Sequence, residues 1–267
     1  MTPKQRINYI TKWIKSYATK NKIDTLVVGV SGGIDSAVVS TLCARTGLYT
    51  MAVSMPIRQS EHTHDLSVRH GEWLKDNFEL VDHYTIDLTP TFEQFEHATR
   101  VFSDELAYAN SRARLRMATL YQLAQSNNGI VVGTGNKVED FGVGFYTKYG
   151  DGGVDISPIG DCLKTEVWAM GRELGVIQDI IDAAPTDGLW ADGRTDEDQI
   201  GMTYPDLERM MALDFLKRAS IVDSDMPGST KLSADDRKKL KRYQELRARN
   251  SHKMQPIPVC TMPKDKQ

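Results

Sequence analysis

The residues best suited to do chemistry form a short glycine- and serine-rich stretch, GVSGGIDS, directly after an apolar run and directly before a helical pattern at residues 37–45. Two adjacent glycines let the backbone turn tightly and bring bare N–H groups against phosphate oxygens, and the following helix adds the positive end of its dipole. Ser31 and Ser36 add hydroxyl donors. The stretch therefore predicts a phosphate-binding loop made of Gly29, Val30, Ser31, Gly32, Gly33, Ile34, Asp35 and Ser36.

Asp35 indicates which phosphate chemistry the loop serves. The loop has neither the G-K-[ST] spacing of a Walker A motif nor the pattern G-x-G-x-x-G. An aspartate among phosphate-binding groups repels its ligand unless a cation lies between them, so Asp35 predicts a Mg²⁺ bridge. A lone aspartate at a helix start is usually an ordinary first-turn acid. Inside S-G-G-x-D-S we favour the metal.

The elements that must position this loop follow from four short apolar or β-branched runs, at residues 25–30, 49–55, 81–86 and 129–132. Apolar residues on consecutive positions are typical of strands covered on both faces. Helical patterns separate the runs, and the first carries Ile7, Ile10, Ile14 and Tyr17 on one stripe. Right-handed crossovers then predict an α/β fold with a doubly wound parallel sheet, helices on both faces, and ligands at the carboxyl ends of the strands.

The second half of the chain begins with a glycine-rich span, residues 134–160, that shows no sustained periodicity. A span this long is usually functional or mobile, and we expect it to become ordered on ligand binding. Helices are predicted at residues 164–174, 204–218 and from 233 to about 250. No repeat or linker divides the chain, so residues 1–267 are predicted to form a single domain with a helical C-terminal part.

Composition excludes several classes of protein. The chain has 267 residues, 40% hydrophobic and 26% charged, which is typical of globular proteins. No apolar stretch approaches the roughly 20 residues of a membrane span, no export signal is visible, and a net charge of −3 gives no basic field for nucleic acid. Cys43, Cys162 and Cys260 lie far apart and are odd in number, which favours a reducing compartment. We expect a cytoplasmic protein that binds neither nucleic acid nor membrane.

Residues 31–36 resemble the pyrophosphatase loop of the N-type ATP pyrophosphatases, which cleave ATP between the α and β phosphates to make an adenylate. Three further segments resemble the NAD synthetases within that group: GTGNKVE at 133–139, FYTKYGDGGVD at 145–155, and residues 185–198, which include Pro185-Thr186, GLW at 188–190 and TDED at 195–198. His252-Lys253 matches the closing motif of the family. The resemblance runs from about residue 5 to residue 258.

The resemblance implies a ligase that forms a C–N bond on an adenine nucleotide alpha hydrolase-like, Rossmann-like fold. Deamido-NAD⁺ would take AMP from ATP onto its nicotinate carboxylate with release of pyrophosphate, and ammonia would then displace AMP to give NAD⁺, the last step of NAD⁺ biosynthesis. ATP is the co-substrate and Mg²⁺ the implied metal. Both steps build negative charge on phosphoryl oxygens, which requires cations aimed at them.

The same resemblance assigns site residues. It implies that Asp35 and Glu139 hold Mg²⁺, and that Thr134, Lys164 and Thr186 contact ATP along with the phosphate loop. A lysine at a helix start is mildly disfavoured by the dipole, which favours a functional Lys164. Lys164 and Asp151 are the implied catalytic residues, with Asp151 orienting the carboxamide or ammonia. The implied deamido-NAD⁺ site consists of Arg114, Lys148, Asp155, His252 and Lys253.

Three arginines alternate along one helical segment, and their spacing separates them. Arg112 and Arg116 share a face, whereas Arg114 points about 200° away from Arg112. Arg114 matches the substrate-binding arginine of the family, in the pattern N-x-[KR]-A-R-x-R-M. We interpret Arg112 and Arg116 as ion-pairing surface residues, one of which could meet a partner subunit.

The implied assembly is a homodimer whose interface builds part of the deamido-NAD⁺ site, through a helix bearing Leu115, Met117, Leu120 and Leu123. The phosphate loop begins at Gly29, so the sequence leaves no room before it for a nitrilase-like glutaminase, and free ammonia is the expected donor. The G-T-G-N and G-L-W segments look more like the archaeal and glutamine-dependent subgroup, which leaves a separate glutaminase subunit open.

Two alternative functions and two further sequence features, a group of histidines and a basic segment, bear on this interpretation. A tRNA thiolase would normally bring cysteine pairs or an RNA-binding appendage, and a nucleotide sensor of the universal-stress type would lack the set Asp35, Glu139 and Lys164. The histidines at 62, 64 and 70 lack the acids or cysteines that zinc prefers. The basic segment 237–249 is interleaved with acids and is interpreted as a solvated helix face.

Overall fold

The computed structural model describes residues 1–59, 61–186, 195–218 and 232–262. Its centre is a four-stranded parallel sheet in the order β3-β2-β1-β4. The strands are β1 (Thr25–Gly29), β2 (Tyr49–Ser54), β3 (Val81–Thr85) and β4 (Gly129–Val131). Each begins where the sequence predicts and ends within a residue of it. β1, β2 and β4 are largely buried, as expected for strands covered on both faces, whereas in the edge strand β3 only Val81 is buried. The strand order reverses between β1 and β4, which places a switch point there.

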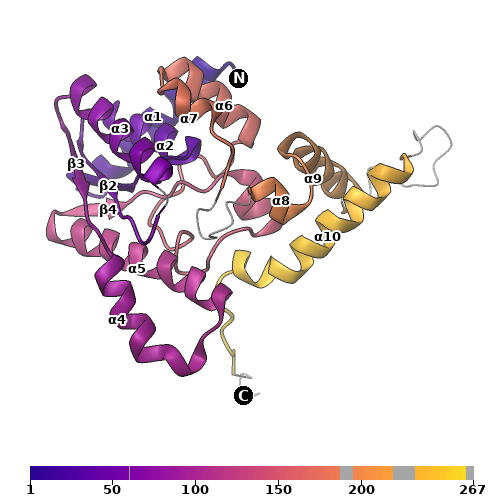
Figure 1. The fold of residues 1–267 in the computed structure, drawn as a ribbon. Helices are drawn as coiled ribbons and strands as arrows, with labels where there is room; N and C mark the ends of the chain where they lie inside the picture. The colour runs from indigo at the N-terminus through magenta and orange to yellow at the C-terminus, as the bar shows by residue number, and fades with distance from the viewer. Residues whose placement is uncertain (60, 187–194, 219–231, 263–267) are drawn as a thin grey trace, which may run out of the picture.

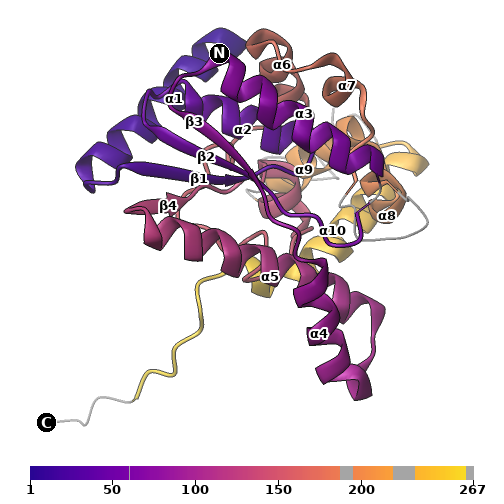
Figure 2. The same cartoon turned by 60° about the vertical axis from the view of Figure 1, so that its left-hand side comes forward.

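Helices cover both faces of the sheet, as predicted (Figures 1 and 2). Leu26 and Val28 of β1 pack in one core cluster with α1 (Pro3–Lys20), α2 (Ile34–Ala44) and α6 (Lys164–Leu174). Val27 points to the opposite face, in a cluster that includes side chains of α4 (Thr89–Thr99) and α5 (Glu105–Ser126). This alternation follows from the two-residue period of a strand. α3 (Glu61–Asn77) packs against β2 and β3.

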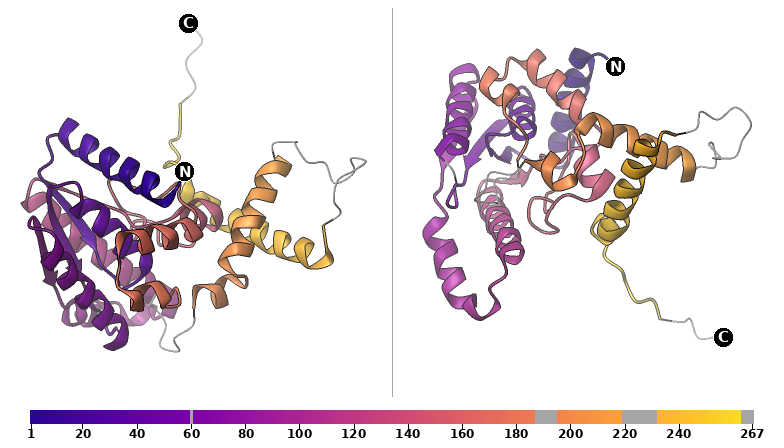
Figure 3. Two further views of the ribbon diagram at one scale, coloured as in Figure 1. Left: turned by 90° about the horizontal axis from the view of Figure 1, so that it is seen from above. Right: turned by 45° about the vertical axis from the view of Figure 1, so that its right-hand side comes forward.

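The remaining elements lie beyond the sheet. They are the short helices η1 (Arg100–Phe102) and α7 (Gln178–Asp182), a π-helical turn η2 (Lys137–Val143), α8 (Asp196–Ile200), α9 (Tyr204–Arg218) and α10 (Ala234–Met254). Figure 3 shows α9 and α10 packed together away from the sheet. Side chains of η2, α8, α9 and α10 share a separate core cluster. The glycine-rich span therefore contains one helical turn that its lack of periodicity concealed.

One close helix contact matters for the site. A Cβ at Gly171 would lie 2.6 Å from Cδ1 of Ile34, so only a glycine lets α6 approach α2 this closely. At their N-termini the two helices are joined by the side chains of Lys164 and Asp35. Across the ranges given above, no helix is long and apolar enough to cross a membrane.

Candidate active site

The predicted phosphate loop has a rigid internal hydrogen-bond scaffold. The Ser36 hydroxyl donates to the carbonyl of Gly33 at 2.9 Å and accepts from the backbone N–H of Ser31 at 3.1 Å. Gly32 holds φ at +85°, a conformation that favours glycine. Gly33 is the N-cap of α2 and places no side chain over the first N–H groups of the helix. Those donors are thus available to an anion, as the sequence predicts.

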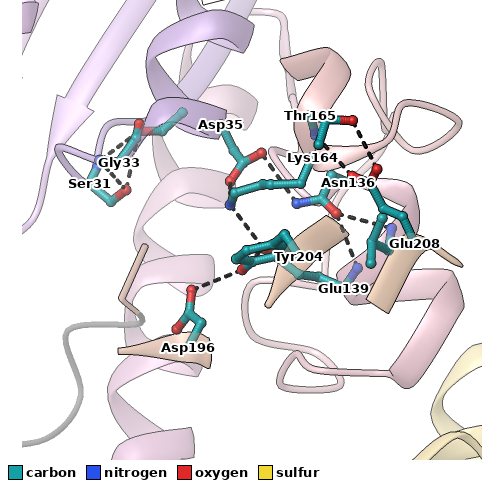
Figure 4. Close-up of polar contacts among 12 residues, drawn as sticks. Ser31, Gly33, Asp35, Asn136, Glu139, Lys164, Thr165, Asp196, Tyr204 and Glu208 are labelled. Carbon is teal, nitrogen blue, oxygen red and sulfur yellow. Dashed lines mark hydrogen bonds and ion pairs between the residues drawn. The ribbon is translucent and has the colours of Figure 1, made fainter. Parts of the chain in front are cut away.

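Lys164 lies at the centre of a buried ionic cluster, shown in Figure 4. Its Nζ is 2.5 Å from Oδ2 of Asp35 and 2.9 Å from Oε1 of Glu139. Asp35 begins α2 after β1, and Glu139 lies in η2 after β4, so the two acids approach from the two sides of the switch point. Burial opposes the charged form of Lys164, but both carboxylates outweigh it and raise its pKa. The sequence-predicted trio therefore meets at one point.

Asn136 and Tyr204 hold this cluster in place, and the sequence predicted neither. The Asn136 carboxamide oxygen caps η2 by accepting from Val138 and Glu139, while its amide donates to Asp35 at 3.3 Å. The buried hydroxyl of Tyr204 donates to Glu139 and lies 3.3 Å from Oδ2 of Asp196. Burial and the neighbouring carboxylates raise the pKa of Tyr204, so it stays a donor. A tyrosine in an amphipathic helix carries no sequence signal for this role.

Asp35 and Glu139 fit a hard divalent cation. Both carboxylates already converge on a single positive atom, and carboxylate oxygens are the ligands that Mg²⁺ prefers. Among the residues whose placement is described, no group of three or more acidic, histidine or cysteine side chains is arranged to hold a metal ion. Two protein carboxylates nonetheless suit Mg²⁺, because it commonly completes its coordination with substrate phosphates and water.

A cavity of about 580 Å³ opens over this cluster at the carboxyl edge of the sheet. Most of the predicted residues line it: Gly29, Val30, Ser31, Gly33, Ile34, Asp35, Ser36, Thr134, Glu139, Asp151, Lys164, Thr186 and Lys253. Gly32 is buried within the turn of the loop. The GLW motif at 188–190 falls outside the described residues.

The predicted dinucleotide-site residues do not all gather. Lys148 donates to the carbonyl of His252 at 3.3 Å, and Lys253 donates to the carbonyl of Tyr146 at 2.7 Å, so three members meet where α10 ends. Asp155 instead accepts hydrogen bonds from Tyr121 and from the backbone of Val131. Arg114 is exposed and does not line the cavity of this chain.

Arg116 corrects the expectation of an ion-pairing surface residue. It lines the cavity, and its guanidinium donates to the carbonyl of Met55 at 3.0 Å and to Oε1 of Gln59 at 2.8 Å. No ion pair of Arg116 is found among the described side chains. Helical spacing placed Arg116 and Arg114 on different faces but could not say which face met the cavity.

Asp140 is a second residue that sequence reasoning missed. Its carboxylate lies against Gly135, where an added Cβ would come within 1.9 Å of Oδ2, and it lines the cavity. Burial, reinforced by Glu139 and Asp151, raises the pKa of Asp140 well above its usual value. A side chain at the position after Thr134 would thus collide with a neighbouring carboxylate.

Comparison with known proteins agrees with this geometry. The NAD synthase family profile matches residues 6–257. The NH(3)-dependent NAD(+) synthetase of Mesoplasma florum is 39% identical over 79% of this chain and 86% of its own length, and that of Methanosarcina mazei is 35% identical over 94% and 96%. The structure of NMN synthetase from Francisella tularensis superimposes with a TM-score of 0.84 at 34% identity, covering 98% of this chain and all of that one. The chain belongs to the NAD synthase family.

Proposed function

We propose that the protein is an ammonia-dependent NAD⁺ synthetase that amidates deamido-NAD⁺ at the expense of ATP. The observation that carries this is the convergence of the phosphate loop, Lys164, Asp35 and Glu139 on one cavity at the switch point of the sheet. Membership of the NAD synthase family and the names of its ammonia-dependent relatives support the same reaction.

The chemistry consists of two displacements. A nicotinate carboxylate oxygen bonds to the α-phosphorus of ATP while the bond to the β-phosphate bridging oxygen breaks, and pyrophosphate leaves. Ammonia then bonds to the carbonyl carbon, loses a proton, and AMP leaves with the electron pair of the broken C–O bond. The N–H groups at the start of α2 and the ammonium of Lys164 oppose the negative charge that develops on the phosphoryl oxygens.

Asp35 and Glu139 would hold Mg²⁺, which supplies charge neutralisation between these carboxylates and the ATP phosphates. Lys164 now neutralises both acids and would exchange them for phosphate oxygens when ATP binds. Thr134 and Thr186 border the same cavity and would contact ATP. Asp151, whose Oδ1 accepts from the N–H of Thr147, would orient the carboxamide or ammonia.

The deamido-NAD⁺ site would use Lys148, His252 and Lys253 together with Arg114 and Asp155. Of these five only Lys253 lines the cavity of this chain, and Arg114 and Asp155 are not among the three that meet at the end of α10, which suits a site completed by a second copy. We therefore propose a homodimer of single-domain chains. Three free cysteines, two of them buried, support a reducing compartment such as the cytoplasm.

Nicotinate mononucleotide is a second candidate substrate, favoured by the match to NMN synthetase over 98% of this chain. The same two displacements on its carboxylate would give NMN. A direct comparison decides between the two acids. Purified protein with ATP, Mg²⁺ and ammonium chloride is given deamido-NAD⁺ or nicotinate mononucleotide, and NAD⁺, NMN, AMP and pyrophosphate are quantified by chromatography.

We expect the larger kcat/KM with deamido-NAD⁺, and AMP equal to NAD⁺ formed. A larger kcat/KM with nicotinate mononucleotide would transfer the assignment to the second candidate. ADP and phosphate in place of AMP and pyrophosphate would contradict both.

A further inference from the structure

One face of α5 forms a wall of the cavity, and a single charge lies on that wall. The lining residues of α5 recur at helical spacing: Leu106, Asn110, Ala113, Arg116, Met117 and Leu120. Five of these six are neutral. Arg116 is the charged one, and its helix packs directly against β1 and β4.

The position of Arg116 along α5 places it beyond the end of β1. A Cβ built on Gly29, the last residue of β1, would lie 3.4 Å from Cδ1 of Leu120, so Leu120 covers the end of the strand. α5 leads into β4, which runs parallel to β1, so the helix runs antiparallel to both. Arg116 precedes Leu120 by about one turn, roughly 5 Å, and therefore lies on the side where the phosphate loop leaves the sheet.

Two neutral acceptors fix the orientation of the Arg116 guanidinium and leave some of its N–H donors unused. Nε–H donates to the Met55 carbonyl and Nη2 donates to Gln59, which together use two of five N–H groups. Met55 and Gln59 both lie in the segment that follows β2, so α5 and this segment together define the orientation of the Arg116 fork. Burial, with a contribution from nearby Arg112, lowers the pKa of Arg116 to about 10, and Asp151 opposes this shift.

A purely structural role does not account for a charge at this place. A largely buried cation costs desolvation free energy that neutral acceptors only partly repay. A neutral side chain could tie α5 to the end of β2 without that cost. Lys164, by contrast, is fully compensated by Asp35 and Glu139. Among the described residues Arg116 makes no ion pair, and its guanidinium is already oriented toward the cavity by two neutral acceptors.

We propose that Arg116 binds a nucleotide phosphate group in this cavity through the free side of its guanidinium fork. The inference rests on the proposed function and adds to it a binding residue on the β2 side of the phosphate loop. Planar guanidinium matches two phosphate oxygens at once, which a lysine cannot do. The phosphate has two possible sources, ATP or the acid substrate.

Calorimetric titration of each nucleotide alone tests the proposal. The proteins are wild type, Arg116→Gln, Arg116→Lys and Arg172→Gln, an exposed arginine near the end of α6 that serves as the matched control. The ligands are α,β-methylene-ATP with Mg²⁺, deamido-NAD⁺ and nicotinate mononucleotide. Separate titrations keep this result independent of turnover, so failure of the proposed reaction and failure of this inference are distinguishable.

Arg116→Gln should lower the binding affinity for at least one nucleotide by about tenfold or more. Arg116→Lys should have an intermediate affinity, and Arg172→Gln should bind within twofold of wild type. The affected nucleotide identifies the source of the phosphate. Binding of all three ligands to Arg116→Gln within twofold of wild type would overturn the proposal. Thermal denaturation establishes that each variant is folded.

A second measurement needs no variant and covers the case in which Arg116→Gln does not fold. Wild-type protein is modified with phenylglyoxal, with and without each nucleotide, and the modified arginines are quantified by mass spectrometry. The bound nucleotide should reduce the modification of Arg116 severalfold and leave the modification of Arg172 unchanged. Equal modification of Arg116 with and without every nucleotide would contradict the proposal.

Discussion

Lys164 shows how a single side chain can serve two states of the site. Its ammonium is almost fully buried between Asp35 and Glu139, where an unpaired charge would be costly. The same two carboxylates are the proposed Mg²⁺ ligands. A cation can therefore enter only if Lys164 gains other anionic partners, which the ATP phosphates would provide.

The acids of this trio should control metal affinity. Asp35→Asn or Glu139→Gln removes one of two charged ligands, so the Mg²⁺ concentration for half-maximal activity should rise by about tenfold or more. Mn²⁺ binding in the presence of α,β-methylene-ATP, followed by electron paramagnetic resonance, provides a readout besides activity.

Asp161→Asn is the matched control for this experiment, because Asp161 is exposed and pairs only with Lys137 among the described residues. It should leave the Mn²⁺ affinity unchanged. Mn²⁺ affinity at the wild-type level in both Asp35→Asn and Glu139→Gln would reject the metal assignment.

At the scale of elements, α9 supports the site from behind. Tyr204 at its start holds Glu139, and Glu208 one turn later accepts from both the N–H and the hydroxyl of Thr165 at 2.9 Å each. Glu208 thereby caps the N-terminus of α6, next to Lys164 (Figure 4). The cap and the tyrosine lie on the same face of α9, because four residues separate them.

Tyr204→Phe should slow the reaction without removing a ligand. The substitution deletes a charge-assisted hydrogen bond to Glu139, an effect of about 2 kcal/mol or a loss of roughly tenfold or more in kcat/KM. Steady-state kinetics at saturating and limiting Mg²⁺ measure it. Tyr108→Phe is a suitable control, since that hydroxyl makes only a long contact of 3.5 Å outside the site. Unaltered kinetics in Tyr204→Phe would show that α9 does not position Glu139.

His70 links α2 to α3 and should make folding sensitive to acid. Its Nε2 lies 2.9 Å from the Ser40 hydroxyl, and burial lowers its pKa from 6.5 to about 4. Between these values the unfolded chain binds more protons, so stability falls as the pH drops through this window, by about 3 kcal/mol in total. His70→Gln should remove that part of the pH dependence.

Urea unfolding at pH 7 and pH 4 tests this expectation, with the exposed His97→Gln as the control that should behave like wild type. The quantity to compare is the change in the free energy of unfolding between pH 7 and pH 4, in the variant relative to wild type. Buried acids whose pKa is raised change this free energy in the opposite direction, and the comparison cancels their contribution. A pH dependence of unfolding in His70→Gln equal to that of wild type would contradict the account.

β1 and β2 could be predicted closely because they are buried on both faces. Helices 164–174 and 204–218 could be predicted because their ends carry clear signals. The phosphate loop, Asp35, Glu139 and Lys164 could be predicted because each lies in a local motif. Arg116 and Tyr204 could not, since their roles depend on which face of a helix meets the cavity. Asp140 is fixed by a contact with Gly135 that no spacing rule reveals.

At the scale of the whole molecule, the structure offers a second surface on which the proposed homodimer could form. Leu115, Leu120 and Leu123 are partly buried against the core cluster of the sheet, and Met117 lines the cavity, so this face of α5 offers only part of its apolar surface to a second copy. Several of the exposed apolar side chains lie on α4, η1 and the start of α5, which project from the body (Figure 2): Phe95, Val101, Phe102 and Leu106. Exposed apolar side chains that gather on one part of a molecule commonly mark a protein interface.

The proposed homodimer should therefore depend on this patch. Phe102 is 80% exposed, and Phe102→Asp should convert a dimer of about twice 29.9 kDa to monomers in sedimentation analysis. Phe215→Asp is the control, since Phe215 is also exposed but lies on α9. A wild-type monomer would reject the dimer, whereas a Phe102→Asp dimer would reject only this location.

The most direct test of the central claim follows one oxygen atom. The account requires the nicotinate carboxylate to attack the α-phosphorus of ATP, so one carboxylate oxygen must end in AMP. Deamido-NAD⁺ labelled with ¹⁸O in its carboxylate is incubated with the protein, ATP, Mg²⁺ and ammonium chloride, and the products are analysed by mass spectrometry. We predict one ¹⁸O in the phosphate of each AMP and none in pyrophosphate. Label in inorganic phosphate or pyrophosphate, or unlabelled AMP alongside labelled NAD⁺, would contradict adenylation at this site.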